Sequence, residues 1–272
     1  MIELAGHRTR QMVTDNVASI FQFQLPGEED CIKPFGHCLS DDEINRAESF
    51  RVRCAKQHYI HVRATLRRLL GLILEIAPQD VVFGYSPTGK PFISEATSGG
   101  RTIQFNVSHC DDVALIGICE GAEIGVDIES IDQRIEVDEI AALMLAQNEL
   151  AGISRYTARE RRLGILRAWT RKEAIVKAIG CGFSVDPRDI VVDIGPQARP
   201  ELIELPEEIG KLSTWKVFDL PLGLSHVGAL AIPSLVASKS TIGVSDICPV
   251  DGYSRIVALA STTTLQRADC ED

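Results

Sequence analysis

The sequence has 272 residues, of which 45% are hydrophobic and 24% charged, so it can bury a sizeable core without disulfides or structural metals. The formal net charge of −10 argues against a general nucleic-acid binder, although a local basic patch can still hold phosphate. No run approaches the roughly 20 apolar residues of a membrane span, and the first residues lack the apolar stretch of a secretion signal. We therefore expect a cytoplasmic protein without nucleic-acid or membrane partners.

The eight cysteines are dispersed and none belongs to a CxxC pair. In a chain of this kind such cysteines are mostly small buried side chains, so a structural zinc site is not expected.

Helices and strands are predicted in a repeated order. Ser40 followed by Glu43 predicts a capped helix over 40–50, and apolar spacing predicts a second helix over 56–74. Strands follow at 80–86, 90–94, 102–109, 113–120 and 123–131. Helices over 137–151 and 157–179 then precede strands at 189–194, 201–205, 215–220 and 227–232. This order predicts an α+β fold of two similar lobes.

The domain organisation is predicted from this order of elements and, for the C-terminal tail, from composition. We expect a peripheral N-terminal segment over 1–38, an N-terminal subdomain over 39–116 and a C-terminal subdomain over 117–235. Residues 236–272 are rich in Ser, Thr and Asp, which predicts a loosely attached tail.

Positive charge is concentrated in residues 46–68, where seven Lys and Arg side chains accompany one acid, Glu48. A solvated helix face is the ordinary interpretation of such a run. The other interpretation, which stays open at this point, is a phosphate-binding patch.

Two acids lie in the segment Gly125-Val126-Asp127-Ile128-Glu129. In a strand, Asp127 and Glu129 project from the same face, where two close carboxylates favour a divalent cation. Oxygen ligands point to Mg²⁺ or Mn²⁺ rather than zinc. The alternative is an edge strand that shows two acids to water.

Further candidates lie on the second long helix and at a strand end. Trp169, Glu173 and Lys177 share one helical face, either as a surface ion pair or as a third carboxylate beside a phosphate contact. Ser108 and His109 are adjacent, so they do not by themselves form a nucleophile–base pair. The sequence has no Walker A or GxGxxG loop, which excludes the common nucleotide-binding motifs.

Taken together and in order, these segments resemble the surfactin-type 4′-phosphopantetheinyl transferases. The resemblance covers about residues 39–232 and rests on Gly89-Lys90-Pro91, Phe105-Asn106-Val107-Ser108-His109, Gly125-Val126-Asp127-Ile128-Glu129 and Trp169-Thr170-Arg171-Lys172-Glu173-Ala174. It implies two α+β subdomains related by a pseudo-twofold axis, with coenzyme A (CoA) in the cleft between them. It also implies a Mg²⁺-dependent monomer that transfers phosphopantetheine to a serine of an apo acyl or peptidyl carrier protein and releases 3′,5′-ADP.

The resemblance also implies roles for individual residues. Asp127, Glu129 and Glu173 match the metal ligands, with Mn²⁺ as an alternative to Mg²⁺. Asp127 also belongs to the catalytic residues, together with Glu173, the candidate base, and Lys177, which matches the lysine beside the transferred phosphate. The remaining matches are CoA contacts: Lys90, Ser108, His109 and, for the nucleotide phosphates, Arg46, Lys56 and His58.

Two departures from the family pattern and two alternative functions accompany this interpretation. Cys110 stands where the family often has Ser or Thr, and His58 stands where Arg is common. A Mg²⁺-dependent CoA pyrophosphate hydrolase, or a non-catalytic homologue that binds CoA or a carrier protein, would use a similar set of residues.

Overall fold

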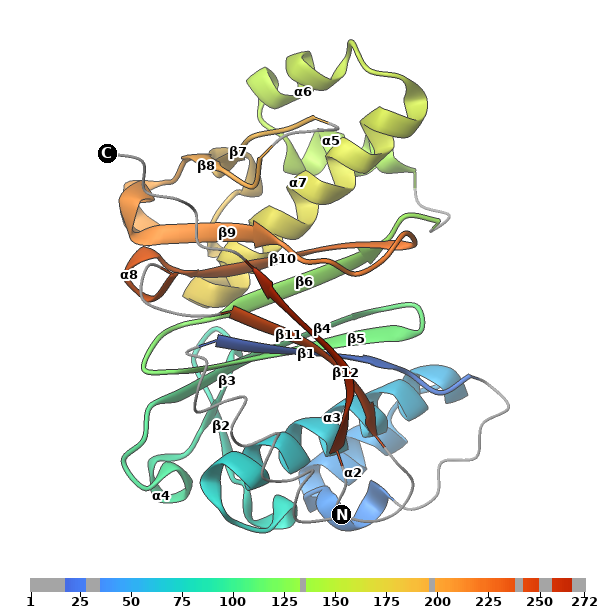
Figure 1. The fold of residues 1–272 in the computed structure, drawn as a ribbon, viewed down its shortest axis with the longest axis vertical. Coiled ribbons are helices and arrows are strands. Elements are labelled where there is room, and N and C mark those ends of the chain that lie inside the picture. Colours follow the sequence, from blue (N-terminus) through green and yellow to red (C-terminus); the bar gives the residue numbers. More distant parts are fainter. Residues whose placement is uncertain are drawn as a thin grey trace.

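The computed structural model describes residues 18–27, 35–132, 136–195, 199–237, 242–249 and 256–265. Its elements form four layers, in which two stacked β-sheets lie between two layers of helices (Figure 1). An apolar cluster fills the space between the sheets, with Ile20 and Leu115 from one sheet and Val126 and Leu230 from the other. No helix in this described part is long and apolar enough to cross a bilayer.

The N-terminal subdomain is a sheet covered by one long helix. The strand order is β12-β11-β1-β5-β4, and the strands are β1 (Ala18–Gln24), β4 (Ile103–Cys110), β5 (Val113–Glu120), β11 (Ile242–Pro249) and β12 (Ile256–Leu265). Helix α3 (Arg53–Leu74) packs on it through apolar side chains that include Leu66, Leu70 and Ile73. Helix α2 (Asp41–Glu48) begins at Ser40, whose hydroxyl accepts from the Glu43 N–H at 3.4 Å, so the predicted cap is confirmed.

The C-terminal subdomain repeats this plan with a smaller sheet. The strand order is β6-β10-β9, with β6 (Gly125–Ser130), β9 (Trp215–Asp219) and β10 (His226–Pro233). Helix α7 (Ala158–Ile179) covers the sheet. The single helix predicted over 137–151 is wrong in detail, because extended backbone at Leu145 and Ala146 separates α5 (Val137–Met144) from α6 (Gln147–Ile153).

Short elements complete both subdomains. In the first they are β2 (Phe83–Tyr85), β3 (Pro91–Ile93), α4 (Glu95–Ser98) and 3₁₀ turns at Phe35–Cys38 and Pro78–Asp80. In the second they are β7 (Val191–Val192), β8 (Leu202–Glu204), α8 (Ser234–Ala237) and 3₁₀ turns at Gly182–Ser184, Pro187–Asp189, Glu207–Ile209 and Leu212–Thr214.

The two subdomains share one topology. In the first, β1 pairs antiparallel with β5 and β5 pairs antiparallel with β4. In the second, β6 pairs antiparallel with β10 and β10 pairs antiparallel with β9. A 22-residue helix covers each sheet, and only the first sheet is extended by β11 and β12 among the described residues. A small hairpin separates the helix from the later strands in both (β2–β3 and β7–β8). The predicted α+β fold of two similar subdomains is therefore confirmed, and a pseudo-twofold relation between them accounts for the shared topology.

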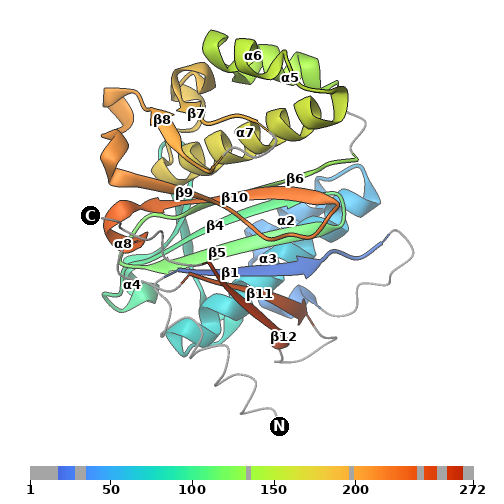
Figure 2. The ribbon, with the colours of Figure 1, turned by 45° about the horizontal axis from the view of Figure 1, so that its top comes forward.

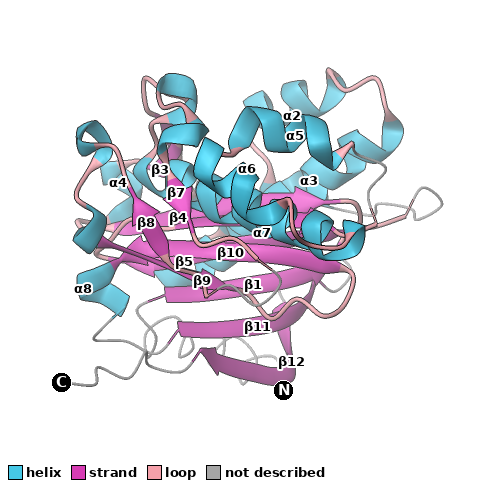
Figure 3. Cartoon of the chain, turned by 90° about the horizontal axis from the view of Figure 1, so that it is seen from above, coloured by secondary structure: helices cyan, strands magenta, loops and turns pink. Residues whose placement is uncertain are grey.

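The predicted domain limits need correction. Strand β1 lies in the middle of the N-terminal sheet between β11 and β5, with Ile20 and Phe21 fully buried, so residues 18–24 are not peripheral. The C-terminal region is also incorporated, because β11 pairs in parallel with β1 and buries Ile242 and Val244 (Figure 3). The boundary predicted at 116/117 falls inside β5. Residues 1–17 lie outside the described part.

The two subdomains meet along the edge strands β4 and β6, which lie side by side (Figure 2). The Val126 N–H donates to Asn106 Oδ1 at 2.9 Å, and the Ser130 N–H donates to Cys110 Sγ at 3.3 Å. Side chains of β4 thus satisfy backbone groups of β6, and this fixes the position of the β6 acids relative to β4.

Candidate active site

Asp127 is the centre of the candidate site. Its neighbours Val126 and Ile128 face the apolar cluster between the sheets, so the alternation of the strand turns Asp127 toward α7. Its Oδ1 accepts from Ser108 Oγ at 2.9 Å and from Lys177 Nζ at 2.5 Å. The side chain is buried rather than shown to water, which excludes the surface-acid interpretation.

The other oxygen of Asp127 is unsatisfied. Oδ2 is buried and has no hydrogen-bond partner among the described residues. Burial raises the pKa of Asp127, and the charge and hydrogen bond of Lys177 and the hydrogen bond of Ser108 oppose this effect. A buried carboxylate oxygen without a partner is costly, so this atom is suited to receive a cation.

Gly125 allows α7 to approach this strand. A Cβ at Gly125 would lie 1.9 Å from the Ala174 carbonyl oxygen and 2.5 Å from the Ala178 nitrogen. The glycine of the Gly-Val-Asp-Ile-Glu segment is therefore needed for close packing of the helix on β6, which brings the Lys177 ammonium to Asp127.

Glu173 lies one turn before Lys177 on α7. Burial raises the pKa of Glu173, the negative charge of Asp127 raises it further, and Lys177 lowers it. The Glu173 side chain makes no hydrogen bond or ion pair with another described residue, and Lys177 pairs with Asp127 instead. The alternative of a surface Glu173–Lys177 pair is therefore wrong.

The N-terminal subdomain contributes His109 and His58 to the candidate site, and His109 lies near Lys177. Their rings lie 6.4 Å apart, edge to face, and His58 Nε2 donates to the Pro26 carbonyl oxygen at 3.1 Å. Desolvation lowers the pKa of His109, and the positive charges of His58 and Lys177 lower it further, although the side chain stays exposed. An exposed neutral imidazole beside Lys177 is suited to hydrogen bonding with an anion.

Lys90 reaches the C-terminal subdomain from the turn of the β2–β3 hairpin. Its Nζ donates to Glu123 Oε2 and to the Ala178 carbonyl oxygen, both at 2.6 Å. Lys90 therefore binds the last turn of α7, next to Lys177.

Glu129 is on the same face of β6 as Asp127, as predicted. Cys110 Sγ lies 3.7 Å from Glu129 Oε2 and donates to it, while burial raises the pKa of the Cys110 thiol to about 12 and keeps it protonated. Within the described part of the chain, no three His, Cys, Asp or Glu side chains already form a cluster able to hold a metal ion. The three predicted ligands are thus not assembled into a closed metal site.

Comparison with known proteins assigns both subdomains to the same family. Residues 123–229 match the model of the 4′-phosphopantetheinyl transferase superfamily, and residues 26–120 match that of the 4′-phosphopantetheinyl transferase N-terminal region. The chain belongs to the 4′-phosphopantetheinyl transferase superfamily. The two matches meet at the turn between β5 and β6, which is also where the structure separates the subdomains.

Relatives along most of the chain carry the same name. The 4′-phosphopantetheinyl transferase HetI of Nostoc sp. is 28% identical over 229 residues, which cover 81% of this chain and 89% of HetI. The Synechocystis sp. protein slr0495, whose name places it provisionally among these transferases, is 29% identical over 72% of this chain and 78% of its own. The L-aminoadipate-semialdehyde dehydrogenase-phosphopantetheinyl transferase of Xenopus laevis is 25% identical over 72% and 68% of the two chains.

The nucleotide-directed residues of this phosphopantetheinyl transferase are only partly brought to the site. His58 is beside His109, but Lys56 Nζ pairs with Glu48 Oε2 at 2.7 Å. Arg46 is exposed, stacks over the Tyr59 ring at 5.8 Å and has no carboxylate partner within the described residues. It borders a cavity of about 470 Å³ between α2, α3 and β2.

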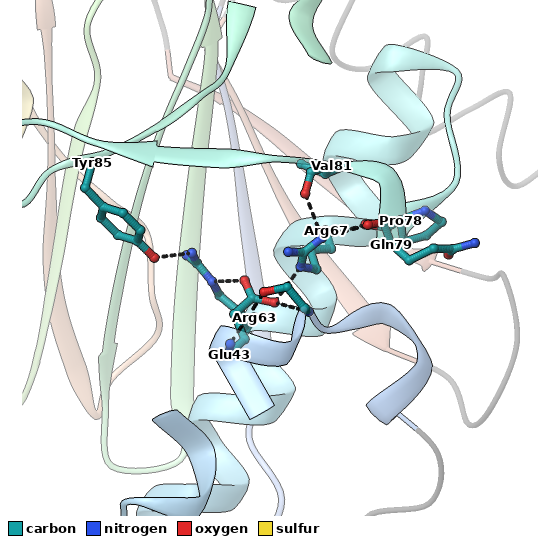
Figure 4. A network of polar contacts seen from close by, with 8 residues as sticks. Glu43, Arg63, Arg67, Pro78, Gln79, Val81 and Tyr85 are labelled. Carbon is teal, nitrogen blue, oxygen red and sulfur yellow. Dashed lines mark hydrogen bonds and ion pairs between the residues drawn. The ribbon is translucent and has the colours of Figure 1, made fainter. Parts of the chain in front are cut away.

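Two arginines of the basic segment are structural. Glu43 accepts from Arg63 Nε at 2.6 Å and from Arg67 Nε at 2.7 Å, and Arg67 also donates to the carbonyls of Pro78 and Val81 (Figure 4). Burial would raise the pKa of Glu43, but these arginines and the Ser40 N–H outweigh it and leave the pKa lowered. Neither interpretation of the basic segment applies to these two side chains.

The segment Trp169–Ala174 of α7 contains two positively charged residues, Arg171 and Lys172, whose structural role could not be predicted from the sequence. Arg171 is buried and donates to both carboxylate oxygens of Asp219 at 2.8 and 2.7 Å. Lys172 is fully buried and donates to Glu149 Oε2 at 2.6 Å. Both partners are remote in sequence, so no local signal distinguishes these structural cations from Lys177.

Proposed function

We propose that the protein transfers the 4′-phosphopantetheine group of CoA to a serine hydroxyl of an apo acyl or peptidyl carrier protein and releases 3′,5′-ADP. The observation that carries this proposal is the buried Asp127, with one oxygen on Lys177 and the other without a partner, beside Glu173 and His109. An anionic substrate with its cation fits such a site, because it supplies the charges that the site lacks.

The reaction forms a bond between the serine oxygen and the phosphorus of the phosphopantetheine group. The bond from this phosphorus to the oxygen of 3′,5′-ADP breaks, and ADP keeps that electron pair. Glu173 accepts the serine proton, and its raised pKa makes it a stronger base than an ordinary glutamate. Lys177, Lys90 and His109 bind and orient the pyrophosphate, while Ser108 keeps Asp127 in place.

The residues present fit a magnesium ion. Asp127, Glu129 and Glu173 would hold it, as the partnerless Asp127 Oδ2 and the raised pKa values of Asp127 and Glu173 favour a positive ion there. When bound, Mg²⁺ offsets the negative charge of the pyrophosphate oxygens. Magnesium is usually bound by one or two carboxylates together with substrate phosphates, which agrees with the lack of a preassembled cluster among the described residues.

The nucleotide end of CoA is assigned to the cavity beside Arg46. Its wall includes the aromatic rings of Tyr59, Phe83 and Tyr85, which suit a purine, and the Arg46 guanidinium, which suits a phosphate. His58 and Lys56 complete the proposed nucleotide contacts, with Lys56 exchanging Glu48 for phosphate. We further propose that the protein acts as a cytoplasmic monomer without nucleic-acid or membrane partners.

Intact-mass spectrometry of a panel of apo carrier proteins tests the proposal. After incubation with the protein, CoA and Mg²⁺, we expect at least one carrier to gain the mass of one phosphopantetheine group on serine. Release of phosphopantetheine without a carrier adduct would instead indicate a CoA pyrophosphate hydrolase. Binding of CoA with neither product would indicate a non-catalytic homologue, and omission of Mg²⁺ tests the metal requirement.

A further inference from the structure

Both lysines that are assigned to the pyrophosphate already hold a carboxylate. Lys177 Nζ donates to Asp127, and Lys90 Nζ donates to Glu123 Oε2 at 2.6 Å. A carboxylate oxygen and a phosphate oxygen bind an ammonium group in the same way. Glu123 therefore occupies a position on Lys90 that a phosphate oxygen of the substrate would take.

The two partners of Lys90 differ in their attachment. The Ala178 carbonyl oxygen belongs to the backbone of α7 and is fixed, and it accepts from Lys90 at 2.6 Å. Glu123 lies in the turn between β5 and β6, its side chain is 43% exposed, and Lys90 is its only ion-pair or hydrogen-bond partner among the described side chains. The Lys90 side chain is only 15% exposed, but water reaches the Glu123 carboxylate and screens the pair, so Glu123 exchanges water for Lys90 at a modest cost in free energy.

We propose that Glu123 is a displaceable internal anion that competes with CoA for Lys90 and so lowers the affinity for CoA. This inference rests on the proposed function, because it requires Lys90 to contact a phosphate. When CoA binds, the Lys90–Glu123 pair opens while Lys90 keeps its bond to Ala178. When transfer removes one phosphoryl group from the nucleotide, Glu123 returns to Lys90 and favours release of 3′,5′-ADP.

Isothermal titration calorimetry with CoA tests this inference, using Glu123→Gln. The substitution keeps the shape of the side chain but removes its charge, and we expect the Kd for CoA to fall by up to about fivefold. The Kd for 3′,5′-ADP is expected to fall as well. An unchanged or raised Kd for CoA would overturn the inference, because Glu123 would then only position Lys90.

Glu120→Gln is the matched control. Glu120 lies three residues earlier, its side chain is 42% exposed, and it pairs with Arg101 at 2.7 Å rather than with an assigned CoA contact. We expect its Kd for CoA to equal that of the wild type. An equal gain in affinity for this variant would show a general charge effect and would also overturn the inference.

Lys90→Ala separates this inference from the proposed function. If Lys90 binds phosphate, Lys90→Ala raises the Kd for CoA, and adding Glu123→Gln to it produces no further change. If Lys90→Ala leaves the Kd unchanged, the proposed role of Lys90 fails independently of Glu123. If Glu123→Gln tightens binding equally with and without Lys90, competition for Lys90 is excluded.

Discussion

Helix α7 carries two lysine–carboxylate pairs, five residues apart, that differ in how completely they are satisfied. Lys172 Nζ donates to Glu149 and to the carbonyls of Met144 and Pro187, so all three of its protons have acceptors. Glu149 uses both oxygens, since Oε1 accepts from the Val192 N–H and Oε2 from Lys172 and a backbone N–H. This pair is closed to any ligand.

The second pair, Lys177–Asp127, is open. Asp127 Oδ2 has no hydrogen-bond partner among the described residues, Glu173 nearby is also without one, and Lys177 is partly exposed. The same residue types on the same helix thus fasten the fold at one position and offer a binding site at the other. Both pairs contain buried charge. They differ because the second pair leaves a carboxylate oxygen without a hydrogen-bond donor or a cation, whereas the first pair does not.

Removing the carboxylate charge from each pair is expected to have the largest and most distinct effects. Asp127→Asn should lower carrier-protein modification by about 10²–10³-fold or more, because the site loses its central charge. Thermal unfolding should show that the protein remains folded. Transfer assayed by intact mass under saturating CoA provides the measurement.

The control for this comparison is Glu149→Gln. It leaves the buried Lys172 without its carboxylate, which should cost about 3–5 kcal/mol of unfolding free energy in a denaturant titration. Turnover per folded molecule should stay near the wild-type value. The comparison breaks if Asp127→Asn retains wild-type turnover or if Glu149→Gln loses it while folded.

The approach of α7 to β6 is the next test. Gly125→Ala places a methyl group against the Ala174 carbonyl, so we expect a loss of about 3 kcal/mol of stability or more, together with loss of transfer. Gly164→Ala, on α7 itself, is the control, since its added Cβ would have no contact closer than 3.8 Å. That variant should be slightly stabilised, by about 0.5–1 kcal/mol. Equal stability of the two variants would contradict the close-packing argument.

A smaller change, this time a gain in stability, is expected when the charge of Glu173 is removed. Because folding raises the pKa of Glu173 above its ordinary value of 4.5, the folded state binds this proton more tightly than the unfolded state. Stability therefore falls as the pH rises through the raised pKa, and the penalty persists at neutral pH. Glu173→Gln should remove it and raise the Tm at pH 7 by about 2–4 °C for each kcal/mol recovered.

Calorimetry at pH 7 and near pH 4 measures this effect of Glu173→Gln. The difference in Tm between variant and wild type should shrink at the lower pH, where Glu173 is protonated. A lower Tm of the variant at pH 7 would mean that Glu173 has a stabilising partner.

The sequence predicted those features that depend on local periodicity. The two-residue period of a strand places Asp127 and Glu129 on one face, and the helical period places Glu173 and Lys177 on another. The sequence could not reveal which charges are closed off by remote partners. Arg63 and Lys172 have partners 20 and 23 residues away, and only the folded arrangement brings them together.

Strand β1 shows the same limit in the fold itself. Residues 18–24 are predicted to belong to a peripheral segment, and this prediction is wrong because the central place of β1 depends on β5 and β11, which begin about 90 and 220 residues later in the chain. The tail composition, rich in Ser and Thr, concealed β11 because polar residues also occupy its sequence between the buried Ile242, Val244 and Ile247.

The parallel pairing of β1 with β11 has a consequence for synthesis of the protein. The first strand of the described chain gains its outer neighbour only after the whole C-terminal subdomain has left the ribosome, so until then one edge of the nascent N-terminal sheet is bare. Truncation from the C-terminus that removes β11 would therefore destabilise the N-terminal subdomain, which is synthesised first.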